Sequence, residues 1–232
     1  CQAGETLQKV KQLDLSNNGL GDAEIELLSK SRCLPKLEKL FLNHNKISDS
    51  GAKILAESKL VQNISCLMLE ANQIGVNGAQ SLATSLNLKN LETLFLDSNP
   101  IGPEGAEALA RSTCLPSLTA LHMDSTGMGD QGVKAIAASQ TLSKIKKLYL
   151  CSNKIGDEGA IALSQSPNLS HLTCLSIWRN EIRDAGGKAI AESNHFLKLE
   201  RLYMSLNLIE KPTRKLIRAS DMASRLKTLV MD

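Results

Sequence analysis

Aromatic side chains are scarce in this chain of 232 residues, which holds one Trp, two Tyr and three Phe, or 3% of the total. No apolar run reaches the roughly 18 residues that a transmembrane helix needs. Six cysteines are too few for a small secreted domain held together by disulfides. Hydrophobic residues nevertheless make up 42% of the chain, so we expect a buried core built from aliphatic side chains.

Neither sign of charge dominates the sequence. The 27 basic and 24 acidic residues give a net charge of +3, and no long basic block occurs. This balance argues against nucleic acid or an anionic membrane as the partner. The N-terminal residues also lack the apolar segment of a secretion signal, so we expect a cytoplasmic location.

A repeat of constant length runs through the chain without insertion or deletion. Each unit has the spacing L-x-x-L-x-L-x-x-N-x-I, and successive units lie 27 residues apart. The first aliphatic position recurs at Val10, Leu37, Ile64, Leu91, Leu118, Ile145, Leu172 and Leu199. These positions begin eight full units, with partial units at residues 1–9 and 226–232, and predict a single domain over residues 1–232.

The second half of each unit carries a helical pattern. Gly51-Ala52 is followed by Leu55-Ala56, and the same arrangement returns in the next units. Apolar residues at i, i+3 and i+4 indicate a helix. Each unit should therefore form one short strand and one helix. Parallel strands stack about 4.8 Å apart and packed helices about 9 Å apart, so the stack must curve with its strands inside. We expect a curved α/β solenoid (a horseshoe) with a concave parallel sheet and convex helices.

This pattern resembles the leucine-rich repeat, and the helical second half resembles the ribonuclease-inhibitor-like, cytosolic subtype. That subtype includes ribonuclease inhibitor, the Ran GTPase-activating protein and the recognition arrays of NOD-like receptors. The resemblance implies a non-catalytic module that binds a protein partner through its concave face. Two alternatives remain open. One is a regulator of a small GTPase, and the other is a sensor or scaffold segment of a larger protein or a bacterial effector acting in the host cytosol.

The polar residues that recur in each unit indicate a structural role rather than a catalytic one. The Asn of each unit should satisfy backbone groups at the turn after the strand, and only Thr126 breaks that column. The cysteines lack C-x-x-C spacing, and we expect no cofactor, no metal site and no catalytic residue. His122 lies beside Asp124 and Cys151 simply because all three share one face of the sheet. Cys151 is the one thiol that we expect to be exposed.

Side chains alternate between the two faces of a strand, so the residues between the repeated leucines point to the concave side. Five of the six aromatic residues fall at these positions. Tyr, Trp and Arg are enriched in binding hot spots, and exposed apolar surface marks interaction sites. The expected anchors are Phe41, Met68, Phe95, Tyr149, Trp178 and Tyr203. The competing explanation is that these rings only stabilise neighbouring strands.

Charged residues divide this face into two parts. Glu70, Asp97 and Asp124 lie beside the apolar anchors of the first part, whereas Lys147, Arg179 and Arg201 flank the aromatic anchors of the second. The three carboxylates should lie about 5 Å apart and repel one another. A Lys or Arg of a partner would relieve that repulsion, although a merely solvated polar strip is equally compatible with the sequence. We expect the chain to be monomeric.

Overall fold

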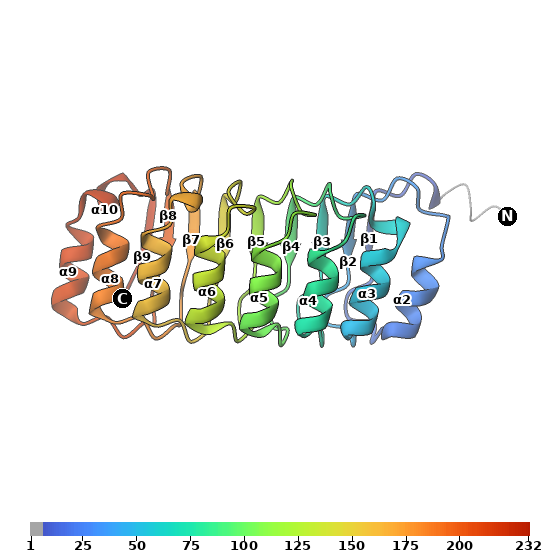
Figure 1. The fold of residues 1–232 in the computed structure, drawn as a ribbon, viewed down its shortest axis with the longest axis horizontal. Helices are drawn as coiled ribbons and strands as arrows, with labels where there is room; N and C mark the ends of the chain where they lie inside the picture. The colour runs from blue at the N-terminus through green and yellow to red at the C-terminus, as the bar shows by residue number, and fades with distance from the viewer. Residues whose placement is uncertain (1–6) are drawn as a thin grey trace.

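The computed structural model describes residues 7–232, and a short strand recurs in every unit (Figure 1). The strands are β1 (Gln12–Asp14), β2 (Lys39–Phe41), β3 (Cys66–Met68), β4 (Thr93–Phe95), β5 (Ala120–His122), β6 (Lys147–Tyr149), β7 (Cys174–Ser176), β8 (Arg201–Tyr203) and β9 (Thr228–Val230). They form one parallel sheet in chain order. Each strand pairs with the equivalent residues of the next unit, as Leu40 does with Leu67.

Helices follow the strands and cover one face of the sheet (Figure 1). They are α2 (Asp22–Ser29), α3 (Asp49–Glu57), α4 (Val76–Ala83), α5 (Gly102–Ala110), α6 (Gly129–Ala138), α7 (Asp157–Ser164), α8 (Asp184–Ala191), α9 (Lys211–Arg218) and α10 (Asp221–Arg225), with 3-10 turns η1 (Lys59–Val61) and η2 (Pro167–Leu169). The row of helices extends beyond the row of strands at both ends in Figure 1. The strands therefore line the shorter, inner side, and the predicted α/β solenoid is confirmed.

The core lies between the sheet and the helices and is aliphatic. The repeated leucines of the inner strands, such as Leu67 and Leu94, are fully buried. Phe196 is the single aromatic residue of this core and is 1% exposed. The equivalent leucines of the outermost strands, Leu13 and Leu229, are only partly buried. Each unit thus relies on its neighbours to cover its apolar surface, as expected for a repeat array.

The asparagine column joins neighbouring units, as its position in the repeat predicted. Asn72 Nδ2 donates to the carbonyl oxygens of Leu42 and Leu69 at 3.0 and 2.9 Å. Its Oδ1 accepts the backbone N–H of Ile47 at 3.0 Å. At the one exception, the Thr126 hydroxyl donates to the carbonyl oxygen of Met123 at 3.0 Å. Backbone groups of two units that would otherwise be buried without a partner are satisfied in this way.

Two further polar columns link the helices, and the sequence reading did not identify them. A buried serine after each of the helices α3 to α8 donates to a carbonyl oxygen at the end of the preceding helix, as Ser85 Oγ does to Ala56 at 2.5 Å. An aspartate at the start of one helix caps the next. Asp49 Oδ1 accepts the backbone N–H groups of Gly75 and Gly78 at 2.6 and 2.9 Å. These columns stabilise the helical side of the interface between units.

The aspartate cap also explains the recurring glycine of the helical half in the units that have such a cap, at Gly51, Gly78, Gly159 and Gly186. A Cβ atom on Gly78 would lie 2.7 Å from Asp49 Oδ1 and 2.6 Å from Ile74 Cγ2. Both distances are shorter than a normal contact. Glycine is therefore required here because the two neighbouring helices approach closely around the capping carboxylate.

Candidate functional site

The expected anchor residues lie on the face of the sheet that the helices leave uncovered. Five of them occupy the last position of their strands and are partly exposed, whereas the aliphatic residues on either side are buried: Phe41, Met68, Phe95, Tyr149 and Tyr203. Trp178 follows β7 by two residues and is 37% exposed. The alternation of side chains thus places the anchors on the concave face, which we define as the candidate site.

A stack of three rings crosses the middle of this face. The ring of His122 lies 3.9 Å from that of Phe95 and 4.1 Å from that of Tyr149, with interplanar angles of 25° and 14°. Burial, with a smaller contribution from the charge of Lys147, lowers the pKa of His122 to about 4. The imidazole is therefore neutral at pH 7. It acts as an aromatic surface rather than as a cation.

The stack joins the two parts into which the sequence reading divided the face. Phe95 belongs to the first part and Tyr149 to the second, and the only prediction for His122 is that it shares one face of the sheet with Asp124 and Cys151. The position of His122 in the repeat could have revealed the stack, because Phe95 and Tyr149 occupy the same repeat position on the strands to either side. An imidazole at this position can therefore stack on both rings.

The expected acidic residues do come together, and two of them also serve the sheet. Asp97 Oδ1 accepts the backbone N–H of Asp124 at 2.7 Å, and Asp124 Oδ1 accepts that of Cys151 at 2.6 Å. Burial, with repulsion from Asp124 and Glu70, raises the pKa of Asp97 to about 7. Burial also raises the pKa of Asp124. Backbone N–H groups thus hold both carboxylates in place, but they do not offset the cost of burying the two negative charges.

The basic residues of the second part differ in their surroundings. Arg201 lies on β8, and its Nε is buried without a hydrogen-bond partner among the described residues. Lys147 is exposed at the start of β6. Arg179 lies in the turn after β7 with a left-handed φ of 55°, at the margin of the face.

Burial and a contact with the Cys174 thiol at 3.7 Å raise the pKa of Tyr149 to about 12.

The prediction that Cys151 is the exposed thiol is wrong. Cys151 is 8% exposed, and its Sγ lies 3.0 Å from Ser176 Oγ on the neighbouring strand. Burial raises its pKa to about 11, which makes it a poor nucleophile. A thiol is too short to rise above its larger neighbours on this face. The exposed cysteine among the described residues is Cys33, in the loop after α2.

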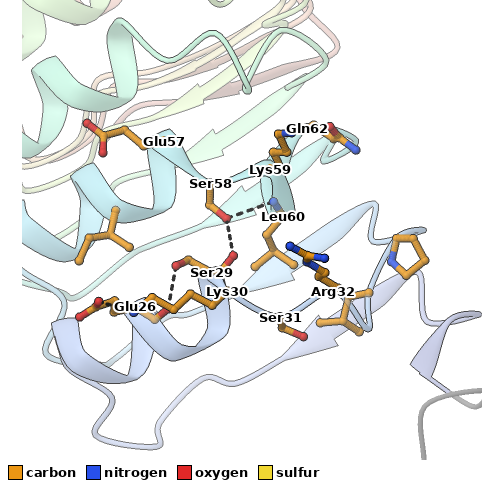
Figure 2. Close-up of a pocket in the computed structure, with 13 residues that line it drawn as sticks. Glu26, Ser29, Lys30, Ser31, Arg32, Glu57, Ser58, Lys59, Leu60 and Gln62 are labelled. Carbon is orange, nitrogen blue, oxygen red and sulfur yellow. Dashed lines mark hydrogen bonds and ion pairs between the residues drawn. The ribbon is translucent and has the colours of Figure 1, made fainter.

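A hollow also lies elsewhere, between the end of α2 and the turn η1 (Figure 2). Some of the polar groups that line it are already paired within the protein. Ser58 Oγ donates to the carbonyl oxygen of Ser29 at 3.0 Å and accepts the N–H of Leu60 at 3.1 Å. Lys30 pairs with Glu26 at 2.6 Å. No aromatic side chain lines this hollow, so the concave face, where five of the six aromatic residues gather, remains the better candidate.

Two features that the described residues lack bear on the kind of site. Between residues 7 and 232, no three His, Cys, Asp or Glu side chains are grouped so that they could hold a metal ion. Over the same residues, no helix has the length and apolar character needed to cross a bilayer.

Comparison with protein families identifies the repeat. A model described as leucine-rich repeats in two copies matches residues 8–53. A second leucine-rich repeat model matches residues 87–110, 114–137, 141–164 and 168–191. Together these matches cover more than half of the chain. A search of curated proteins gave no significant match. The matched segments, the constant period and the parallel sheet with its helical outer row agree, and the chain belongs to the leucine-rich repeat proteins.

Proposed function

We propose that this chain is a non-catalytic recognition module that binds a protein partner through its concave face. The observation that carries the proposal is the distribution of aromatic residues. Five of the six lie on the concave side, and only Phe196 belongs to the core. Leucine-rich repeat domains are generally protein-interaction modules. A band of partly exposed rings on a rigid sheet supplies the preorganised apolar surface that such binding needs.

The residues that we assign to the interface are the six expected anchors, with charged residues as their complement. The anchors are Phe41, Met68, Phe95, Tyr149, Trp178 and Tyr203, and the charged residues are Glu70, Asp97, Asp124, Arg179 and Arg201. His122 joins them through its stack with Phe95 and Tyr149.

Cross-strand packing competes with this interpretation for part of the set. Each ring pair of the stack stabilises the sheet by about 0.5–1 kcal/mol, so Phe95 and Tyr149 have a structural role whether or not a partner binds. Trp178 and Tyr203 make no aromatic pair within residues 7–232. Their exposure therefore fits a binding role better than a structural one.

The test is an affinity capture from cytosolic lysate, read by mass spectrometry. The wild type is compared with the triple variant Tyr149→Ala, Trp178→Ala and Tyr203→Ala. We expect the wild type to capture a protein that the variant loses. The matched control replaces exposed leucines outside the concave face by alanine: Leu27, Leu86 and Leu197, which are 71%, 81% and 66% exposed. Identical captures by the wild type and the concave variant would contradict the proposal, provided that circular dichroism shows both to be folded.

We also assign the chain to the ribonuclease-inhibitor-like subtype, to the cytoplasm and to a monomeric state. The regular helix in the second half of each unit supports the subtype. Unpaired cysteines such as Cys33, Cys66 and Cys114 support a reducing compartment. Sedimentation of the purified chain tests the monomeric state.

A further inference from the structure

The concave face carries opposite charges on its two halves. The face of β3–β5, taken with the residue two positions after each strand, contributes Glu70, Asp97 and Asp124 and no Lys or Arg. The corresponding positions of β6–β8 contribute Lys147 and Arg201 and no Asp or Glu. We call these sets the acidic half and the basic half. The neutral stack of Phe95, His122 and Tyr149 spans the boundary between them.

Neither half is neutralised by the rest of the described chain. In the acidic half, the one ion-pair partner within residues 7–232 is His44, whose Nε2 lies 3.7 Å from Glu70 Oε1. The hydrogen bonds of Asp97 and Asp124 come from backbone N–H groups. No ion pair within residues 7–232 includes Lys147 or Arg201.

The margin of the basic half does not change this balance. Glu200 precedes Arg201 in the sequence, but it pairs with Lys227 at 2.9 Å. The buried Nε of Arg201 has no hydrogen-bond partner in the part of the chain that the structure describes. A partly buried guanidinium without an acceptor is complementary to a carboxylate that a partner would bring.

The strand spacing gives the distance between the halves. The acidic half is centred on β4, and the two basic residues lie on β6 and β8, so their centre is β7. Three strand intervals of about 4.8 Å place the two centres about 14 Å apart. This is well beyond the reach of one side chain, and it exceeds the screening length of about 8 Å at physiological salt. The two halves therefore act as separate electrostatic sites.

We propose that the partner is a protein whose contact surface carries a basic patch and an acidic patch about 14 Å apart, which fixes the direction in which it docks along the array. The inference rests on the proposed function of the concave face. In the correct direction each patch meets its opposite charge, whereas a reversed partner would bring like charges together. A second copy of this chain is not the expected occupant, because two faces that both curve inward meet only at their ends.

Synthetic peptides with blocked termini test the inference on the full chain. The diblock peptide has an arginine block and a glutamate block joined by a Gly/Ser linker. About seven linker residues give a mean span of about 14 Å. Two further peptides of the same length keep one charged block and replace the other by Gly/Ser. At low salt, we expect the diblock to bind at least about tenfold more tightly than either single-block peptide, because both blocks bind together.

Neutralising variants assign each block to its half. Asp97→Asn and Asp124→Asn together keep an oxygen that can accept the backbone N–H, so the sheet should be retained. This variant should weaken the diblock and the arginine peptide but not the glutamate peptide. Lys147→Gln with Arg201→Gln should do the reverse. Glu57→Gln with Glu104→Gln on the helices is the matched control for net charge, and it should leave all three affinities unchanged.

Several outcomes would overturn the inference. One is equal affinity of the diblock and the arginine peptide for the wild type, and another is unchanged affinity in both concave variants. A dimer in sedimentation that either concave variant dissociates would assign the face to a second copy instead. Suppose that the lysate capture loses its partner in the triple alanine variant while the diblock behaves like a single block. The proposed function would then stand, and the charge inference alone would fail.

Discussion

Replacing Asn153 by alanine should show how strongly the asparagine column holds neighbouring units together. Asn153 is fully buried. Its Oδ1 accepts the backbone N–H groups of Thr126 and Gly127, both at 2.9 Å. Its Nδ2 donates to the carbonyl oxygen of Met123 at 2.7 Å and to that of Cys151 at 3.1 Å.

The cost follows from the groups that would lose their partners. The carbonyl oxygen of Met123 keeps the Thr126 hydroxyl, and that of Cys151 keeps the N–H of Ser125. The N–H groups of Thr126 and Gly127 have no other acceptor in the described chain. An unsatisfied buried N–H costs about 1–3 kcal/mol and the partly buried N–H of Gly127 costs less, so Asn153→Ala should destabilise the array by about 2–5 kcal/mol.

The matched control lies in the same column near the end of the array. The Asn18 side chain donates only to the carbonyl oxygen of Ser16, at 2.9 Å, and that bond is exposed. Asn18→Ala should therefore cost less than about 1 kcal/mol. Urea denaturation followed by circular dichroism measures both variants. Equal losses for Asn153→Ala and Asn18→Ala would refute this account of the column.

Four further predictions concern single positions. Ala71 has a φ of 51°, so Ala71→Gly should stabilise the fold by up to about 1 kcal/mol, measured by thermal denaturation; a lower melting temperature would contradict this. Gly78→Ala should cost about 1–3 kcal/mol, because its Cβ would lie 2.7 Å from Asp49 Oδ1, and an unchanged urea midpoint would argue against the close approach. The folded protein favours the protonated form of Asp97, as its raised pKa shows. The wild type should therefore lose stability relative to Asp97→Asn as the pH rises from about 4 to about 7, by at most about 4 kcal/mol. Parallel pH profiles of the two proteins would exclude this linkage. A thiol reagent should modify Cys33 before any buried cysteine, as mass spectrometry of the labelled peptides would reveal.

The fold could be predicted from the sequence because a constant period leaves little choice. Leucines such as Leu40 and Leu67 recur at one spacing, so each strand must pair in register with the next. The concave position of Phe95 and Tyr149 followed in turn from the alternation of side chains along a strand. These inferences needed only the backbone geometry that all units share.

The features that could not be predicted from the sequence depend on contacts between units. Ser85 and Asp49 are polar, so they read as surface residues, yet they bond to a neighbouring helix. Cys151 is buried because Ser176 on the next strand covers it. The environment of His122 likewise comes from rings on both neighbouring strands. Their environments therefore emerge only when the units are stacked.

The bridging amides also bear on how the chain folds. Asn72 bonds to residues 25 and 30 positions earlier, and the other columns span similar separations. Every contact between units therefore closes a loop of nearly the same length, and the entropy lost at each closure is nearly constant. Adding a unit lengthens the array without lengthening any of these loops. Folding can therefore start at any adjacent pair of units and spread in both directions, with each step about as costly as the one before.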